Sequence, residues 1–285
     1  MLLILVAACC VLSVAFYSWP DTVQVMGIVN ATPDSFSDGG LAFTADDAVR
    51  RAHQLVAEGA DLLDLGGESS RPGAEPVALE EELRRVVPVV EALAGSVAVP
   101  LSIDTTKAKV ARRCLAAGAV VINDISALTG DPGLARVVAD AGAGVVLMHM
   151  KGTPRTMREL AEYDDVVAEV YDYLGRRIEW AETQGLPRGR IAIDPGIGFA
   201  KKDTHSLALL RSLERFGSLG CAVLVGTSRK GLLGKITGRA PGDRAVASAV
   251  SALAAVVAGA RIVRVHDVAA TVDALKVWDA QRGLR

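Results

Sequence analysis

Eight short apolar segments alternate with longer amphipathic ones along the chain, and this alternation limits the fold more than any other feature. The apolar segments are about five residues long and rich in Val, Ile and Leu, which is typical of buried parallel strands. They cover residues 23–29, 61–65, 99–103, 119–122, 144–148, 190–193, 221–225 and 261–265. Helix-length segments follow at residues 45–58, 79–94, 107–117, 133–141, 163–183, 205–216, 243–258 and 269–280. The pattern predicts an α/β fold, a single-domain (β/α)8 TIM barrel, with an open doubly wound sheet as the alternative.

The first predicted helix also has recognisable ends. Thr44 precedes it in the position of an N-cap residue, and Gly59 follows its last residue. The pattern therefore predicts a helix over 45–58.

The first 20 residues do not resemble the rest of the chain. Seventeen of them are apolar, and no Lys or Arg occurs before Arg50. A secretory signal peptide would need a basic start, and a membrane span needs about 20 apolar residues. We interpret residues 1–20 as an extension outside the barrel, which then occupies residues 21–285, and we keep a membrane anchor as the alternative.

Charge and cysteine content restrict the partners and the compartment. The 31 Lys and Arg residues nearly balance the 33 Asp and Glu residues, which argues against a nucleic-acid partner. Cys9, Cys10, Cys114 and Cys221 form neither a disulfide framework nor a C-x-x-C metal pattern. Buried cysteines in a reducing compartment fit best, so we expect a cytoplasmic protein, or a membrane-associated one if residues 1–20 act as an anchor.

Polar residues follow the predicted strands at the points where the strands end. Strand ends of a barrel meet at its C-terminal face, so these residues predict one shared active site there. They include Asn30, Glu68 to Arg71, Asp104, Asn123, His149, Asp194, Ser228 to Lys230, Arg264 and His266.

The residue types indicate the chemistry of that site. Arg264 and His266 lie two apart and face the same side of a strand, which suits a phosphate or diphosphate. Asp104, Asn123 and Asp194 suit either a metal or, better, the N–H-rich edge of a heterocycle. The long glycine-rich segments after the first two predicted strands suit mobile lids that close over a bound ligand.

These residues also carry a family resemblance. The stretches that match are 26–40 (MGIVNATPDSFSDGG), 64–73 (DLGGESSRPG), 102–105, 123–126, 147–150, 194–199 (DPGIGF), 228–230 and 264–267. Together, and in this order, they resemble the bacterial dihydropteroate synthases over residues 23 to about 280. The resemblance implies condensation of 6-hydroxymethyl-7,8-dihydropterin diphosphate with p-aminobenzoate, with Mg2+ as cofactor, in a homodimer formed through barrel helices.

The resemblance also implies a role for each matching residue. The pterin would be held by Asp104, Asn123, Asp194, Lys230, Met148 and Ile125, and the catalytic residues would be Asp104, Asp194, Lys230 and Asp38. The diphosphate would contact Asn30, Arg71, Arg264 and His266, with Asn30 also on the metal. The p-aminobenzoate would contact Phe36, Ser70, Pro72, Phe199 and Ser228.

The chain departs from the family pattern at three positions. Ser70 stands where Thr is frequent, Ser206 where Asn is common, and Ala200 where Gly is common. Two alternatives remain, a pterin-binding methyltransferase and a non-catalytic homologue. The methyltransferase needs neither the pair of Arg264 and His266 nor the segment 33–36, so these features favour the synthase.

Overall fold

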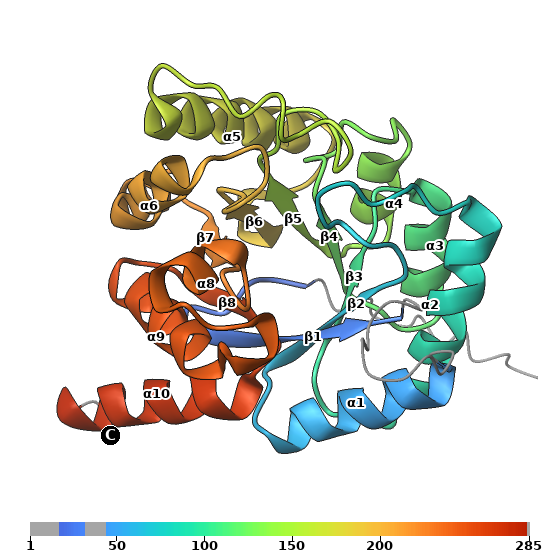
Figure 1. The fold of residues 1–285 in the computed structure, drawn as a ribbon. Helices are drawn as coiled ribbons and strands as arrows, with labels where there is room; N and C mark the ends of the chain where they lie inside the picture. The colour runs from blue at the N-terminus through green and yellow to red at the C-terminus, as the bar shows by residue number, and fades with distance from the viewer. Residues whose placement is uncertain (1–16, 32–43, 284–285) are drawn as a thin grey trace, which may run out of the picture.

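The computed structural model describes residues 17–31 and 44–283, and within them eight parallel strands close into a barrel (Figure 1). Each strand pairs with the next one in the chain, and the last pairs with the first. The strands are β1 (Gln24–Asn30), β2 (Leu62–Gly66), β3 (Leu101–Asp104), β4 (Val121–Asp124), β5 (Gly144–Met148), β6 (Ile191–Asp194), β7 (Ala222–Val225) and β8 (Ile262–Val265). The predicted (β/α)8 barrel is confirmed, and the open sheet is excluded.

Helices surround the strands in the order that the sequence predicts (Figure 1). They are α1 (Ala45–Ala57), α2 (Leu79–Leu93), α3 (Ala108–Ala116), α4 (Leu134–Asp140), α5 (Val166–Thr183), α6 (Asp203–Arg211), α7 (Leu213–Gly217), α8 (Gly231–Thr237), α9 (Ala245–Val257) and α10 (Val268–Gln281). Short 3-10 turns, η2 (Arg188–Arg190) and η3 (Pro241–Asp243), precede β6 and α9.

Two helix predictions need correction. The single helix expected over 205–216 is two helices, because the backbone of Ser212 leaves the helical region between α6 and α7. The short helix α8 was not expected, since its glycines hide the apolar spacing, and it ends at Gly238 in the left-handed region.

The predicted ends of α1 are confirmed. The Thr44 hydroxyl accepts from the Asp47 amide at 3.2 Å, and the Asp47 carboxylate accepts from the Thr44 amide at 3.0 Å, so the two form a capping box. Gly59 follows with a φ of 99°, which an L side chain rarely adopts.

The barrel interior changes from apolar to polar along its axis. An apolar cluster fills one end, and it consists of Trp19, Met26, Leu62, Val121, Val146, Ala192, Ala222, Leu224 and Ile262. Inward-facing side chains recur every second residue of a strand. The next inward positions toward the C-terminal ends therefore include Asp64, Asn123, Asp194 and Arg264, and the polar end is the one where the active site is expected.

Residues 17–20, which the sequence assigns to the extension, belong to the folded body. The Tyr17 amide donates to the Gly142 carbonyl at 3.1 Å, and the indole N–H of Trp19 donates to the Arg190 carbonyl at 3.0 Å. Trp19 is only 8% exposed because it closes the apolar end of the barrel. The boundary at residue 20 is therefore too late. The rest of the proposed extension, residues 1–16, lies outside the described residues, and none of the helices that are described is long and apolar enough to cross a membrane.

Candidate active site

Strand register aligns three of the expected site residues, Asn30, Asp104 and Asn123, along one rim of the barrel. Asn30 of β1 pairs with Gly66 of β2, Gly66 pairs with Asp104 of β3, and Asp104 pairs with Asn123 of β4. On the far side, Met148 of β5 is level with Asp194 of β6. The C-terminal ends of these strands thus bring together residues that are more than 160 positions apart in sequence.

A buried ion-pair network occupies the centre of this rim. Arg264 of β8 donates through Nε to Asp64 at 2.6 Å and through Nη2 to Asp104 at 3.0 Å. Asp64 is fully buried, and it also accepts from the Ser102 hydroxyl at 2.7 Å and from the Asn123 amide at 3.0 Å. One carboxylate therefore fixes the arginine and the amide at once.

Asp64 is a site residue to which the sequence analysis assigned no role. It stands inside a strand, two residues before the end at which functional residues were sought. The signal that could have identified Asp64 is a carboxylate within a fully buried strand, because a buried charge requires a partner.

Burial changes the acidity of the carboxyl groups at this rim. Burial raises the pKa of Asp104 to about 7, against the opposing effect of Arg264, and the negative charge of Asp64 raises it further. Burial also raises the pKa of Asp194, and Lys230 is the main group that opposes this shift.

Lys230 lies beside Asp194 and Phe199. Its ammonium group donates to the Ile197 carbonyl and lies 4.6 Å from the centre of the Phe199 ring. Burial lowers the pKa of Lys230 to about 8, with Asp194 opposing that shift. Asp194 is itself held by the Gly196 amide, which donates to Oδ1 at 2.7 Å.

The backbone segments that follow β5 and β6 pack so closely that position 196 requires a glycine. Gly196 has a φ of 71°, and a Cβ on it would collide with the carbonyl oxygen of His149. Any other residue would push apart the loops that follow β5 and β6.

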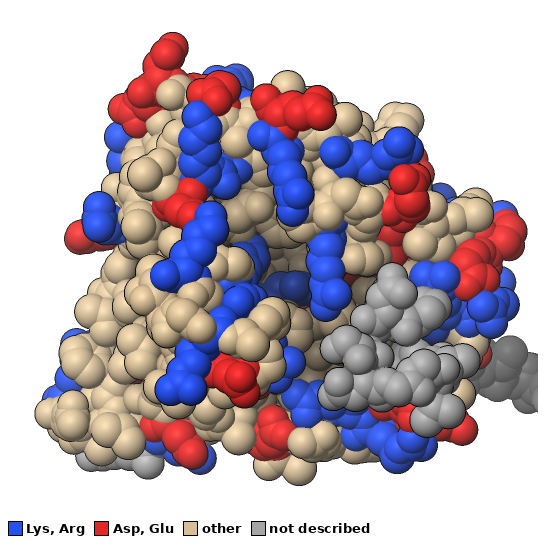
Figure 2. All heavy atoms as spheres, in the orientation of Figure 1, with Lys and Arg blue, Asp and Glu red and all other residues tan. Residues whose placement is uncertain are grey.

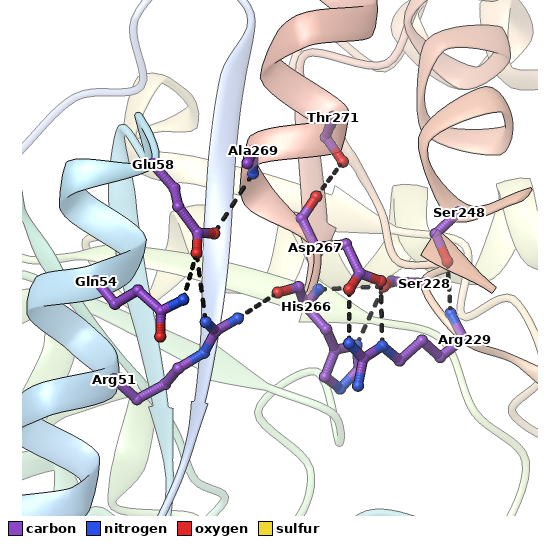
Figure 3. A network of polar contacts seen from close by, with 10 residues as sticks. All are labelled: Arg51, Gln54, Glu58, Ser228, Arg229, Ser248, His266, Asp267, Ala269 and Thr271. Atoms are coloured by element: carbon purple, nitrogen blue, oxygen red, sulfur yellow. Dashed lines mark hydrogen bonds and ion pairs between the residues drawn. The ribbon is translucent and has the colours of Figure 1, made fainter. Parts of the chain in front are cut away.

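Ser228 and His266 meet at the ends of β7 and β8 (Figure 3). The Ser228 hydroxyl accepts from the His266 amide at 3.1 Å and lies 3.1 Å from Nδ1 of the ring. Burial, together with the charges of Arg264 and Arg229, lowers the pKa of His266 to about 3, so the ring is neutral at pH 7. Arg71 is close enough for its charge to contribute to the same shift.

The remaining expected residues lie at the same face. Met148 is buried at the end of β5, Ile125 is half-buried just after β4, Ser70 is half-buried, and Arg71 and Pro72 are exposed after β2. Phe36 and Asp38 lie outside the described residues. Figure 2 shows a hollow in this face, with Lys and Arg side chains around it and within it.

Lys201 is a second residue that the sequence analysis missed. Its ammonium group lies 2.9 Å from Nδ1 of His149, 3.3 Å from the His149 carbonyl and 2.9 Å from the Phe199 carbonyl. Burial lowers the pKa of Lys201 to about 7, and burial and Lys201 lower that of His149 to about 3. A neutral His149 that accepts at Nδ1 gives each ammonium hydrogen a partner.

Comparison with known proteins agrees with this geometry. A family model described as "Pterin binding enzyme" matches residues 26–266. The dihydropteroate synthase of Escherichia coli is 46% identical over 257 residues, which are 90% of this chain and 91% of that protein.

Solved structures agree at the level of the fold. A structure of Xanthomonas albilineans dihydropteroate synthase with 4-aminobenzoic acid superimposes with a TM-score of 0.87 at 52% identity, over 92% of this chain and 94% of that one. The same enzyme in complex with 7,8-dihydropteroate gives a TM-score of 0.83 at 49% identity, over 92% of this chain and 94% of that one. The chain belongs to the pterin-binding enzyme family, as one of its dihydropteroate synthases.

Proposed function

We propose that the mouth of this barrel joins p-aminobenzoate to 6-hydroxymethyl-7,8-dihydropterin diphosphate. The amine nitrogen forms a bond to the exocyclic methylene carbon, the bond from that carbon to the diphosphate oxygen breaks, and the amine loses one proton. Pyrophosphate leaves with the electron pair, and 7,8-dihydropteroate remains. The observation that carries the proposal is the rim itself, where Asp64, Arg264, Asp104 and Asn123 form one hydrogen-bonded unit.

The pterin ring fits the polar interior next to this unit. Its amino-pyrimidinone edge presents paired N–H donors and one carbonyl, which need a carboxylate and a cation as partners. Asp194 supplies the carboxylate, and the Lys230 ammonium and the Asn123 amide supply the remaining contacts. Met148 and Ile125 give the ring apolar contacts.

The diphosphate fits the side of the mouth that carries Asn30, Arg71, Arg264 and His266. The part of the chain that the structure describes has no group of three or more His, Cys, Asp or Glu residues that could hold a metal. An Asn oxygen is a suitable single protein ligand for Mg2+, which often takes its other ligands from substrate phosphates and water. When bound, the metal would neutralise charge on the leaving group, and the arginines do the same through their guanidinium groups.

The p-aminobenzoate ring fits beside Phe199, where the Lys230 side chain lies along the same aromatic face. Ser228 and the loop residues Ser70 and Pro72 complete this subsite, and Phe36 would join them. The Ser228 hydroxyl contacts the carboxylate of the substrate, so the anionic end of p-aminobenzoate points toward the strand ends.

We assign a dissociative path to the reaction, because the amine of p-aminobenzoate is a weak nucleophile and the dihydropterin can delocalise a positive charge. Asp104 and Asp194 end β3 and β6 at the mouth of the barrel, where carboxylates would stabilise that cation. Asp38 would help to exclude water from the closed site.

A pyrophosphate-release assay tests the function. Release that depends on both substrates supports it, while a methyltransferase or a non-catalytic homologue would release none. Asp104→Ala should lower turnover at least 100-fold if the carboxylate stabilises the transition state, and near-normal turnover would contradict its role.

We also propose that two copies of the chain pair through α8, α9 and α10. Val246, Val250 and Val257 of α9 are 77%, 60% and 55% exposed, and Val277 of α10 is 58% exposed. Isolated exposed valines are ordinary, but the spacing of Val246, Val250 and Val257 places them on one face of α9, and α9 packs against both α8 and α10. Val250→Asp should convert a dimer to a monomer in sedimentation analysis, and a wild-type monomer would refute the proposal.

A cytoplasmic location stays a prediction. Its support is that Cys114 and Cys221 are free and buried, and that burial raises the pKa of each thiol to about 12. Such thiols behave as small apolar side chains and suit a reducing compartment.

A further inference from the structure

The segment between β2 and α2 contains a tight turn that carries two of the expected substrate contacts, Arg71 and Pro72. The Ala74 amide donates to the Arg71 carbonyl at 3.0 Å, and Gly73 has a φ of 84°. A proline in the second position and a glycine of positive φ in the third are typical of a type II turn. The proline fixes its own φ, so the turn moves as one body and its placement depends on how its two ends are held.

The far end of the turn rests on the loop that follows β5. The Gly73 amide donates to the Pro154 carbonyl at 2.9 Å, and Glu75 pairs with Arg155 at 3.3 Å. Both members of this ion pair are exposed, and such surface pairs contribute little to stability. One backbone hydrogen bond and one weak ion pair leave the near end as the main source of restraint.

The near end begins against α2, where the chain leaves β2. The Gly67 carbonyl accepts from Nη1 of Arg85 at 3.0 Å, and a Cβ on Gly67 would collide with the Val86 side chain. The backbone at this position therefore lies directly on the helix. This contact fixes the chain as far as Gly67, and the next restraint along the chain is at Glu68.

Glu68 is held by Lys107, which immediately precedes α3. The Lys107 ammonium pairs at once with the carboxylates of Glu68 and of Glu82 on α2. Glu82 is only 1% exposed, and its other oxygen accepts from the Thr105 hydroxyl at 2.6 Å. Thr105 in turn accepts from the Lys107 amide at 3.2 Å. The ammonium is thus fixed on the barrel, and Glu68 ties the loop to it.

Neutralising a buried carboxylate explains only part of this arrangement. Glu82 requires a cation, and this requirement accounts for Lys107. It does not account for Glu68, because the Lys107 side chain is 26% exposed and water can accept its remaining hydrogens. A carboxylate from the loop takes that place instead. Glu68 comes two residues before Ser70 and three before Arg71, so its ion pair restrains residues that are expected to meet the substrates.

We propose that Lys107 is a positioning residue, which holds Glu68 and thereby keeps residues 70–72 in place for the two substrates. The inference rests on the proposed subsites for p-aminobenzoate and the diphosphate. Lys107 belongs to neither subsite, so its effect passes through the loop. Loss of the restraint weakens the same contacts in the ground state and in the transition state, which raises KM and leaves kcat nearly unchanged.

Replacing Glu68 tests the inference without disturbing the buried pair. Glu68→Ala should raise the KM for both substrates about tenfold, the loss expected for one hydrogen bond to a charged group, and should change kcat less than about twofold. Glu80→Ala is the matched control, since Glu80 pairs with Lys109 of α3 at 3.1 Å and both side chains are mostly exposed. The control should keep both wild-type KM values. An unchanged KM in Glu68→Ala overturns the inference.

Variants of Lys107 separate positioning from stability. Lys107→Met leaves Glu82 buried without its cation and should lower the melting temperature. Adding Glu82→Met replaces the buried pair by apolar side chains and should restore most of the melting temperature. The KM values should nevertheless stay raised, because Glu68 still lacks its partner. KM values that return to the wild-type level together with stability would show a purely structural role and overturn the inference.

A double-mutant cycle tests whether Lys107 acts through Glu68. Lys107→Met combined with Glu68→Ala should give the KM values of Glu68→Ala alone, since one contact can be lost only once. Increases that multiply would show independent effects and overturn the inference. Burial raises the pKa of Asp104, and the charges of Asp64 and Glu82 raise it further, so all variants are compared at about pH 8.5, where Asp104 is ionised.

The outcomes also separate the positioning role from the proposed function. Turnover in the wild type, together with unchanged KM values in Glu68→Ala, would refute the positioning role and leave the function standing. Absence of turnover in the wild type would refute the function, and the positioning role with it.

Discussion

Replacing Asp64 by Asn tests whether one buried carboxylate organises the active site. Asp64 is fully buried, with Arg264 and Asn123 donating to Oδ2 and Ser102 donating to Oδ1. An asparagine can keep its oxygen toward the arginine and turn its amide toward Ser102, whose hydroxyl can then accept. The hydrogen bonds are thus retained, and the variant removes little besides the charge.

The loss of the Asp64 charge determines how much stability the Asp64→Asn variant loses. Removing one partner of a buried ion pair costs about 3 kcal/mol of unfolding free energy, since the other charge stays buried. Arg264 keeps Asp104 as a partner, so we expect a value at the lower end of the usual range. Asp140→Asn is the matched control, because its partner Arg136 is 79% exposed and such surface pairs contribute at most about 0.5 kcal/mol.

The same variant shifts the pH dependence of activity. The negative charge of Asp64 raises the pKa of Asp104, so its removal lowers that pKa from about 7. If turnover requires the Asp104 carboxylate, the acid limb of the activity profile moves to lower pH. Denaturant unfolding and a pH series of pyrophosphate release measure the two effects. A stability loss no larger than that of Asp140→Asn, together with an unmoved acid limb, would refute the reasoning.

Three further predictions concern the loop after β6. Lys201→Met removes the ammonium that holds the Phe199 carbonyl and should raise the KM for p-aminobenzoate about tenfold, whereas Lys202→Met, at an exposed pair, should not. Burial lowers the pKa of Lys201 to about 7, so between about pH 7 and 10 the unfolded chain binds more protons than the folded chain. Wild-type stability should therefore rise with pH in this range. Unfolding curves of Lys201→Met should show a smaller rise. Ala200 has a φ of 49°, and Ala200→Gly should raise the melting temperature by relieving about 1 kcal/mol of strain, while Ala141→Gly, at a helical φ, should lower it.

The sequence predicted the barrel because the strands are uniform and buried. Each apolar run lies within a residue or two of an observed strand, since a parallel strand covered on both faces must be apolar along its length. The split at Ser212 and the helix α8 were missed because they depend on tertiary contacts and on glycines that weaken the periodic signal. Trp19 was missed because an apolar leader and an apolar plug have the same composition.

The site was predicted best where a polar residue ends a strand. Asp104 and Asp194 do so, Asn123 is one residue before the end of β4, and the strand ends bring all three to one rim. Lys201 could not be found in this way, because its role depends on the carbonyl oxygens of two loops that approach each other only in the folded barrel.

Asp64 shows what a search restricted to strand ends leaves out, and its partner Arg264, which that search included, shows how Asp64 can be found. Each interrupts a strand that is otherwise apolar, Asp64 in LLDLG and Arg264 in IVRV. A buried charge is stable only with a partner, and the two strands lie on either side of β1 in the closed barrel. Two opposite charges, each isolated within a buried strand, therefore predict one another once the barrel is inferred. The ion pair at 2.6 Å is the contact that this reasoning requires, and it fixes Arg264, to which we assign the diphosphate, beside Asp104.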